Sequence, residues 1–548
     1  MQSTMQDVPL SMAMLLRHGL DNFSTSTVVT WTGESSRTST YAEIGAMAAQ
    51  LANALRKLGV GPGERVGTFQ WNNAEHLAAY LGVPASGSVL HTLNIRLFPE
   101  QLAYTANHAE DKVLICDASL VPVLAKVLVE MKTVEHVLVV GGDESTREPL
   151  TGGSAQIHDF HEVINAEEPS FDWDGQIDER APASMCYTSG TTGNPKGVVY
   201  SHRSLFLHAM AGCMGSAFGI SDRDRLLAIV PMFHASGWGM PYQGWLAGAD
   251  LLMPDRFLQA EPLAKFIEQE KPTFSGAVPT VFSDLLRYVD EHKTDVSSLR
   301  QVVCGGAAVP LSLMQNWHER HGITLIQAWG MTETSPLAAI AHPPAGADID
   351  DWSWRTKTGR IFPAVECRVA GDDGSVLPSD GKSVGEFEVR GPWVTGSYYL
   401  ADDPSKFSDD GWLRTGDVGF LDDKGFMQIS DRSKDVIKSG GEWISSVDLE
   451  NALMGHPDVL EAAVVAVPDE RWSERPLASV VIREGATVDA DELREFLGKS
   501  IAKWQLPERW AFIESVPKTS VGKFDKKVLR SRYADGDLEI VETEGLAK

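Results

Sequence analysis

The chain has 548 residues, of which 43% are hydrophobic and 22% charged, and its formal net charge is −27. This length predicts one large multilayered domain and at least one further domain, and the composition excludes an intrinsically disordered chain. The acidic balance argues against a general nucleic-acid or anionic-membrane surface, because binding a polyanion requires an extended positive field.

We expect a cytoplasmic protein without stable membrane insertion. No stretch near Met1 joins basic residues to an apolar run and a cleavage site, and no window approaches the roughly 20 apolar residues that span a bilayer. The cysteines are scattered and never form a CxxC pair, so reduced thiols are expected rather than disulfides or a zinc site. They are Cys116, Cys186, Cys213, Cys304 and Cys367.

Helical and strand-like patterns alternate along the first part of the chain. Apolar residues recur at helical spacing from Tyr41 to Leu58, and a strand-like run follows at Arg65–Phe69. The next predicted elements are a strand at 226–230, a helix at 280–288, a strand at 299–304, a helix at 312–320 and a strand at 324–328. Such alternation predicts an α/β fold with helix-covered, mostly parallel sheets.

A second unit is expected towards the C-terminus. After Arg390, turns rich in Gly and Asp connect short strands up to Asp431. We therefore place a large N-terminal domain at residues 1–431 and a smaller mobile α+β domain at 432–548, with a hinge at 431–434. The predicted elements of this unit are a helix at 446–454, strands at 462–467 and 478–482, a helix at 489–501 and a strand near 510–513. The acidic tail after Asp535 is expected to be a solvated extension.

The sharpest local signal is the run YTSGTTGNPKG at residues 187–197. Its glycines allow backbone amides to turn toward an oxyanion, its hydroxyl side chains can donate to phosphate oxygens, and Lys196 supplies a positive charge. The run is not a P-loop of the GxxxxGK[ST] type, because Pro195 stands where the second glycine would be. The residues predicted to bind phosphate are Thr188, Ser189, Gly190, Thr191, Thr192, Gly193 and Lys196.

This loop closely resembles the phosphate-binding signature of the adenylate-forming superfamily of acyl-CoA synthetases, peptide-synthetase adenylation domains and beetle luciferases. The runs GGAAVP at 305–310 and QAWGMTET at 327–334 resemble its adenine-binding turn and its second nucleotide motif. The resemblance implies that Thr332 contacts the α-phosphate and that Glu333, with Thr191, holds Mg²⁺. The other nucleotide-binding residues that it implies are Gly306, Ala307, Ala308, Gln327, Ala328, Trp329, Gly330 and Met331.

Three later motifs extend the resemblance over nearly the whole chain. In WLRTGD at 412–417, Asp417 matches the residue that accepts hydrogen bonds from the ribose hydroxyls. In PKTSVGK at 517–523, Lys523 matches the residue that neutralises the carboxylate and α-phosphate oxygens during adenylation. The segment at 431–442 matches the interdomain joint, with Lys434 as the hinge and the two glycines along the pantetheine tunnel. The nucleotide and coenzyme A contacts implied for this segment are Arg432, Lys434, Lys438, Gly440, Gly441 and Glu442.

These residue types suit the chemistry that the resemblance implies. Two anions, a carboxylate and ATP, must be brought together, so cationic groups and a metal have to reduce their repulsion and stabilise charge at the α-phosphorus. Lys196, Lys523 and Mg²⁺ at Glu333 would fill these roles. Neither a general base nor a covalent nucleophile is needed, because the substrate carboxylate is already ionised near neutral pH.

The acid substrate is harder to identify. In PMFHASGW at 231–238, His234 resembles the aromatic gate between the acyl pocket and the thiol tunnel, and it is counted with the catalytic residues. Without that resemblance, His234 is more often a structural histidine and Trp238 is as often ordinary core. Large aromatic side chains in the pocket favour a short or medium acid. The predicted pocket residues are His234, Trp238, Gly306, Trp329 and Pro336, with Ala307 beside them.

The runs GTFQWNN at 67–73 and VLHTLNIRL at 89–97 resemble the bacterial medium-chain acyl-CoA synthetases and, within that branch, the 3-methylmercaptopropionyl-CoA ligases. The resemblance implies an AMP-forming acid:CoA ligase that uses ATP, Mg²⁺ and coenzyme A. The alternatives are a general medium-chain enzyme, a luciferase-like monooxygenase, a carrier-loading module and a non-catalytic nucleotide-binding regulator. The regulator is disfavoured because both Lys196 and Lys523 are present. The sequence leaves the exact acid and a homodimer open.

Overall fold

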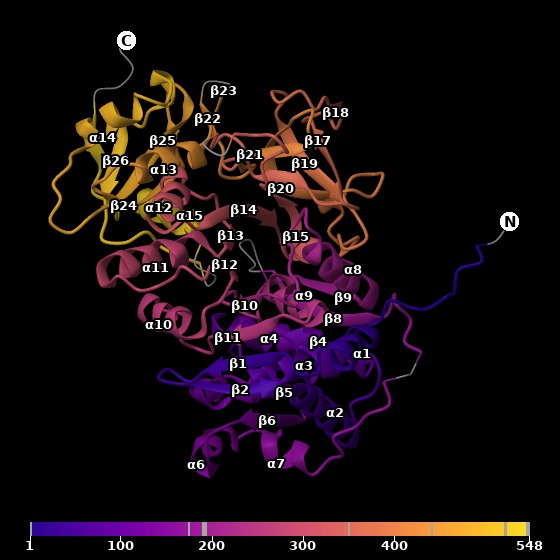
Figure 1. Ribbon diagram of the computed structural model, residues 1–548. Helices are drawn as coiled ribbons and strands as arrows, with labels where there is room; N and C mark the ends of the chain where they lie inside the picture. Colours follow the sequence, from indigo (N-terminus) through magenta and orange to yellow (C-terminus); the bar gives the residue numbers. More distant parts are fainter. Residues whose placement is uncertain are drawn as a thin grey trace.

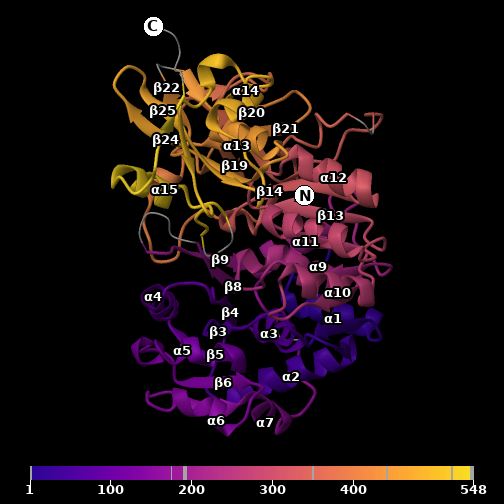
Figure 2. The ribbon, with the colours of Figure 1, turned by 90° about the vertical axis from the view of Figure 1, so that its left-hand side faces the viewer.

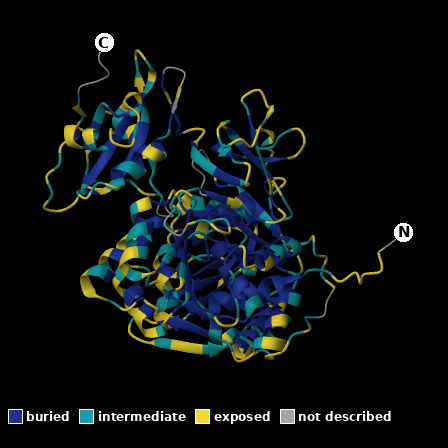
Figure 3. Cartoon of the chain, turned by 45° about the horizontal axis from the view of Figure 1, so that its top comes forward, coloured by how far each residue is buried: buried dark blue, intermediate teal, exposed yellow. Residues whose placement is uncertain are grey.

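The computed structural model describes residues 3–173, 176–188, 194–348, 351–439, 442–519 and 523–543. Two sheets form a large body, and a third sheet forms a smaller C-terminal unit. Figures 1 and 2 show this unit, in yellow, at one end of the body. In Figure 3 the interior of the body is buried, whereas the N-terminal arm is exposed. Among the described residues, no helix is long and apolar enough to cross a membrane.

The first sheet of the body is parallel except for its last strand, β9. In spatial order its strands are β7 (Gln156–Asp159), β6 (His136–Val140), β5 (Asp111–Asp117), β3 (Arg65–Phe69), β4 (Val89–Thr92), β8 (Pro182–Tyr187) and β9 (Gly197–Ser201). Strands β8 and β9 are antiparallel neighbours, and Tyr187 at the end of β8 pairs with Gly197 at the start of β9, at one edge of this sheet.

In the second sheet, the neighbouring strands from β1 to β14 in spatial order are parallel, and the strands on either side of this group are antiparallel to their neighbours. Its parallel strands are β1 (Thr27–Trp31), β11 (Asp250–Met253), β10 (Arg225–Leu227), β12 (Phe274–Ala277), β13 (Gln301–Gly305) and β14 (Thr324–Gly330), with β2 (Ser36–Thr40) antiparallel at the edge beside β1. Beyond β14 follow β15 (Leu337–Ile340), β16 (Gly359–Ile361), β21 (Phe426–Arg432), β20 (Leu413–Leu421), β19 (Gly385–Arg390), β17 (Glu366–Ala370) and β18 (Val376–Leu377).

Helices cover both faces of these sheets. One apolar cluster joins the two sheets through the helices between them, and separate clusters lie on the outer face of each sheet. The inner helices are α1 (Met12–Phe23), α2 (Tyr41–Lys57), α3 (Ala74–Ala85), α8 (His202–Cys213) and α9 (Met240–Ala247). Helices α10 (Ala260–Glu270), α11 (Pro279–His292) and α12 (Leu311–His321) cover the second sheet, and α4 (Pro99–Ala109) and α5 (Val121–Leu124) cover the first. The short helices α6 (Glu144–Arg147) and α7 (Phe160–Asn165) complete the body.

The C-terminal unit has apolar clusters of its own on the two faces of its sheet, which is what an independent domain needs. Its strands are β22 (Ile437–Ser439), β23 (Glu442–Ile444), β24 (Val459–Asp469), β25 (Ser473–Ile482), β26 (Arg509–Phe512) and β27 (Val541–Glu542). Its helices are α13 (Ser446–Met454), α14 (Ala490–Leu497) and α15 (Lys526–Ala534). The expected α/β architecture with a smaller second unit is confirmed.

The predicted elements are present, but some of their ends were wrong. The strand predicted to reach Val230 ends at Leu227, because the side chain of Asn72 binds the carbonyl groups of Ala228 and Val230. The last predicted helix stops at Leu497, before the C-cap Gly498. The acidic tail is not wholly a solvated extension, because Val541 pairs with Trp510 in the sheet. All five cysteines are free thiols.

Candidate active site

A cavity of about 510 Å³ is lined by residues from both the body and the C-terminal unit. Most of its body residues follow the carboxyl ends of parallel strands, the edge at which open α/β sheets bind ligands. After β10 they include Val230, Pro231, Phe233, His234 and Trp238; after β12 and β13, Val278 and Gly306; and from β14 onward, Ala328, Gly330, Met331, Thr332, Glu333 and Pro336. Arg432 and Lys523 line the same cavity.

Thr188 and Lys196, from the two sides of the predicted phosphate-binding run, line this cavity. The amide of Thr188 donates to the carbonyl of Lys196 at 2.9 Å, and the amide of Lys196 donates to Oγ1 of Thr188 at 3.1 Å. The Lys196 ammonium is paired with the carboxylate of Asp403 and lies 5.0 Å from the ring centroid of Tyr398. The predicted phosphate-binding residues at 189–193 lie outside the described residues.

Glu333, the predicted metal ligand, is 7% exposed and accepts a hydrogen bond of 2.6 Å from the hydroxyl of Tyr398. In the described part of the chain, no group of three or more His, Cys, Asp or Glu side chains could hold a metal ion. A lone carboxylate facing a phosphate site nevertheless suits Mg²⁺, which takes one or two carboxylates together with substrate phosphates. Glu333 therefore fits the expected ion.

Asp417 is buried and connects two nucleotide motifs. Its Oδ2 accepts from the indole nitrogen of Trp329 at 2.8 Å, and its Oδ1 lies 3.1 Å from Nε of Arg432. Trp329 and Asp417 are not among the lining residues, whereas Arg432, the ion-pair partner of Asp417, is one of them. The carboxylate retains lone pairs for further hydrogen bonds, because two oxygens offer about four acceptor positions.

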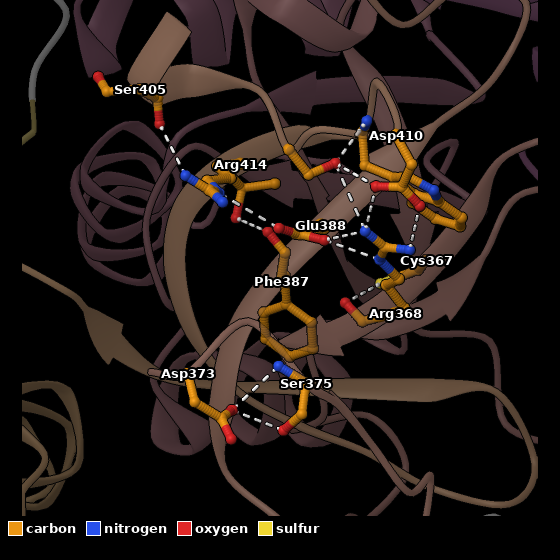
Figure 4. Close-up of polar contacts among 12 residues, drawn as sticks. Cys367, Arg368, Asp373, Ser375, Phe387, Glu388, Ser405, Asp410 and Arg414 are labelled. Atoms are coloured by element: carbon orange, nitrogen blue, oxygen red, sulfur yellow. Dashed lines mark hydrogen bonds and ion pairs between the residues drawn. The ribbon is translucent and has the colours of Figure 1, made fainter. Parts of the chain in front are cut away.

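An arginine network supports the strand that carries Asp417. Figure 4 shows Arg368 between Glu388 and Asp410, and Arg414 extending toward Ser405. Nε of Arg368 donates to Glu388 at 2.7 Å, while its two terminal nitrogens each donate to Asp410 at 2.7 Å. Arg414 contacts Glu388 at 3.3 Å and the carbonyl of Ser405 at 3.5 Å. This network joins β20 to the loop that carries Asp403.

Lys523 is the residue that the C-terminal unit contributes. Its stem lies against Gly306, where an added Cβ would come 3.3 Å from Cε of Lys523. Burial and, next, the charge of Arg432 lower the pKa of Lys523 to about 8. His234 lies nearby, and burial together with the charges of Lys523 and Arg96 lowers its pKa to about 3. His234 is therefore neutral wherever a carboxylic acid substrate is ionised.

Apolar side chains line the part of the cavity at which the sequence predicts an acyl pocket. The ring of Trp238 packs against two glycines: an added Cβ at Gly305 would lie 3.2 Å from it, and one at Gly276 would lie 3.5 Å from it. Phe233, Val278 and Pro336 also line the cavity. A side chain at either position would clash first with another neighbour, because an added Cβ would lie 2.8 Å from the carbonyl oxygen of Ala328 at Gly305 and still closer to Cε of Met240 at Gly276.

Several predicted residues do not reach the cavity. The side chain of Gln327 bonds to the backbone instead: it accepts from the amide of Val309 at 2.8 Å and donates to the carbonyl of Lys357 at 3.0 Å. Lys434, Lys438 and Glu442 are exposed. The predicted residues absent from the lining are Ala307, Ala308, Gln327, Trp329, Asp417, Lys434, Lys438 and Glu442. Gly440 and Gly441 lie outside the described residues.

The sequence reasoning missed Asp403, Tyr398 and Arg96. Each lies in a loop without a regular pattern, and its contact with the site joins distant parts of the chain. Asp403, for example, is 207 positions from Lys196. The only sequence signal for Asp403 and Tyr398 was the polar and aromatic run at 398–407, which falls between two recognised motifs, whereas Arg96 lies in the run at 89–97 that was connected only with a branch of the family.

Comparison with known proteins agrees with this geometry. The AMP-binding enzyme family matches residues 16–399, and the AMP-binding enzyme C-terminal domain matches residues 448–523. The chain is 44% identical over 540 residues to a long-chain-fatty-acid–CoA ligase of Thermus thermophilus, covering 97% of each chain. It is 43% identical over 500 residues to a 3-methylmercaptopropionyl-CoA ligase of Ruegeria pomeroyi, covering 90% of this chain and 92% of the relative.

A solved structure of the anthranilate CoA ligase AuaEII in complex with anthranoyl-AMP has a similar fold. Its TM-score is 0.87 at 27% identity, covering 97% of this chain and 100% of that one. The motifs, the two-unit fold and these matches lead to one conclusion. The chain belongs to the adenylate-forming AMP-binding enzyme family and is an ATP-dependent, AMP-forming ligase.

Proposed function

We propose that this acid:CoA ligase activates a short- or medium-chain carboxylic acid, with 3-methylmercaptopropionate as the first candidate. The observation that carries the proposal is the division of the cavity. Lys196 and Arg432 contribute positive charge to the lining, Trp238 and Phe233 contribute apolar surface, and Lys523 interacts with both Arg432 and His234. A small thioether or alkyl acid matches this division, and the Ruegeria pomeroyi relative supports the thioether.

The reaction has two steps. In the first, a carboxylate oxygen attacks the α-phosphorus of ATP, the bond to the β-phosphate oxygen breaks, and acyl-AMP and pyrophosphate form. In the second, the thiol of coenzyme A attacks the acyl carbon, AMP leaves with the bonding electron pair, and the thiol proton is released to solvent. The net products are acyl-CoA, AMP and pyrophosphate.

The cationic side chains would act mainly in the first step. Lys523 lines the cavity and interacts with Arg432 and His234, so its charge would reduce repulsion between the carboxylate and the α-phosphate. Lys196 would release the carboxylate of Asp403 and bind the outer phosphates of ATP in its place. Asp417 would orient the ribose beside Arg432. Mg²⁺ held at Glu333 would neutralise phosphate charge when bound. Thr188, Thr332 and the loop at 189–193 are proposed to complete the phosphate site.

A longer acid is the second candidate, because the Thermus thermophilus relative is named a long-chain enzyme. Activity assays with a panel of straight-chain and thioether acids distinguish the short- or medium-chain candidate from the long-chain candidate. We expect coenzyme A-dependent AMP release to peak at short or medium acids and at 3-methylmercaptopropionate. A peak at long acids would replace the substrate proposal, and oxygen uptake in place of thioester formation would support a luciferase-like reaction.

Three further expectations remain predictions. They are the domain boundary at Asp431, a homodimer and a cytoplasmic location. The structure adds one observation on the first: β21 of the body ends at Arg432, and β22 of the smaller sheet begins at Ile437. The change of sheet, and the hinge that we propose at Lys434, therefore fall within the same short segment.

A further inference from the structure

One wall of the acyl end is a backbone turn in an unfavourable conformation. Residues 235–239 all have positive φ, from 36° at Ala235 to 73° at Gly239, and Trp238 has a φ of 56°. Left-handed backbone is costly for residues with a Cβ, so such a turn persists only where its surroundings hold it. This turn presents the indole of Trp238 to the cavity.

Asn72 holds the segment that leads into this turn. Its side-chain nitrogen donates to the carbonyl groups of Ala228 and Val230, each at 2.7 Å, and its Oδ1 accepts from the amide of Met232 at 2.8 Å. An asparagine side chain has two N–H donors and one carbonyl oxygen, so every polar group of Asn72 contacts residues 228–232. The side chain is 2% exposed, so water does not compete for these bonds.

The backbone of the same residue holds a second wall segment. The amide of Asp255 donates to the carbonyl of Asn72 at 2.9 Å, and Asp255 itself has a left-handed φ of 53°. Leu258 and Gln259, a few residues further on, line the cavity. Asn72 therefore connects two walls that belong to different strand-to-helix connections.

Tyr80 supports the same segment from helix α3. Its hydroxyl donates to the carbonyl of Met232, and its side chain is fully buried. Neither Tyr80 nor Asn72 lines the cavity, so any effect of Tyr80 on the substrate must pass through residues 228–238, and any effect of Asn72 through these residues or through 255–259.

We propose that Asn72, supported by Tyr80, is a positioning residue that fixes the walls of the acyl pocket and thereby sets which acids the enzyme prefers. This inference rests on the proposed function, since it assumes that the apolar end of the cavity receives the acid. It also gives a physical role to part of the WNN run at 71–73, which the sequence alone connected only with a branch of the family.

The chain offers a matched control. Tyr41, like Tyr80, is fully buried and donates its hydroxyl to backbone carbonyl groups, those of Gly244 and Ala249, which do not line the cavity. Asn72→Ala, Tyr80→Phe and Tyr41→Phe would be compared for kcat/KM across the acid panel and for the KM of ATP. Acid binding would be measured by calorimetry, which needs no turnover, and folding by thermal melting.

We expect Asn72→Ala to lower kcat/KM for the preferred acid about tenfold or more, since a displacement of roughly 1 Å can cost 10²-fold. The preference between acids of different length should flatten, while the KM of ATP stays within about twofold of the parent value. Tyr80→Phe should act in the same direction more weakly, and Tyr41→Phe should keep the parent preference even where it lowers Tm.

A folded Asn72→Ala variant with the parent acid preference would overturn the inference. If that variant fails to fold, Tyr80→Phe decides, and an unchanged preference there overturns it as well. The proposed function fails separately, by absence of coenzyme A-dependent AMP release in the parent enzyme. In that case, calorimetric acid binding tests the positioning role of Asn72 independently of turnover. Equal acid affinities in the parent and the variants would contradict that role.

Discussion

The hydroxyl of Tyr398 donates a hydrogen bond of 2.6 Å to Oε1 of Glu333, while the ring of the same tyrosine lies 5.0 Å from the ammonium of Lys196. One side chain thus orients the proposed metal ligand and contacts the proposed phosphate-binding cation. Residues that orient a metal ligand typically contribute 10–100-fold to metal affinity or activity.

Tyr398→Phe should therefore raise the Mg²⁺ concentration needed for half-maximal adenylation by about tenfold, because Glu333 loses its orienting donor while the ring beside Lys196 remains. Pyrophosphate exchange at varied Mg²⁺ measures this. Tyr399→Phe is the control, since the ring of Tyr399 packs edge to face against His108 and its hydroxyl is not the donor to Glu333. An unchanged Mg²⁺ requirement in Tyr398→Phe would mean that Glu333 is not a metal ligand.

Lys523→Ala should slow adenylation by about 10²–10³-fold, because it removes a charge that stabilises the transition state of the first step. Thioester formation from supplied acyl-AMP should stay near the parent rate. The two half-reactions can be followed separately by pyrophosphate release and by thioester formation. Equal losses in both would contradict the assignment.

The lowered pKa of Lys523 predicts a pH dependence. Burial and the nearby Arg432 lower this pKa to about 8, and only the protonated amine carries the required charge. As the pH rises through 8 the charged fraction falls, so kcat/KM for adenylation should decrease by about tenfold per pH unit well above that value. The residual activity of Lys523→Ala should lack this decrease, and a flat parent profile up to pH 9.5 would refute the prediction.

Lys434→Pro tests the hinge. Lys523 lies in the cavity, whereas Lys438 and Glu442 of the proposed tunnel segment are exposed and outside it. Of these three described residues, the arrangement thus presents to the cavity the one proposed for the first step. Proline fixes φ near −65° and restricts the preceding residue. In Lys434→Pro we expect pyrophosphate release to persist and thioester formation to fall. Lys434→Ala, which does not restrict the backbone dihedrals, should retain both activities. Parent rates of both steps in the proline variant would exclude rotation at this residue.

Trp238→Ala should shift the acid preference toward longer chains. The indole lies between Gly276, Gly305 and the cavity, so its removal extends the apolar end. Each additional buried methylene is worth about 0.8 kcal/mol, or about fourfold in kcat/KM. The acid panel measures this, with Trp317→Phe as a control in the core on the outer face of the second sheet. The same optimum in both variants would place Trp238 outside the acyl site.

The local motifs of the sequence identified the chemistry because each is a short run whose residues act together. Thr188 and Lys196 belong to one such run, and Lys523 ends the run PKTSVGK. The helix over Tyr41–Lys57 and the strand over Arg65–Phe69 were also predictable, since periodicity and turn residues are encoded among neighbours. The end of β10 was not, because a distant side chain determines it.

Only the tertiary structure decided which side chains meet. Glu333 and Tyr398 are 65 positions apart, Trp329 and Asp417 are 88 apart, and Asn72 and Met232 are 160 apart. Periodicity carries no information on such pairs, because contacts across loops depend on how the two sheets and the smaller unit pack together. The sequence therefore determined the family and the type of reaction, while packing determined the partners that orient Glu333, Asp417 and the wall carrying Trp238.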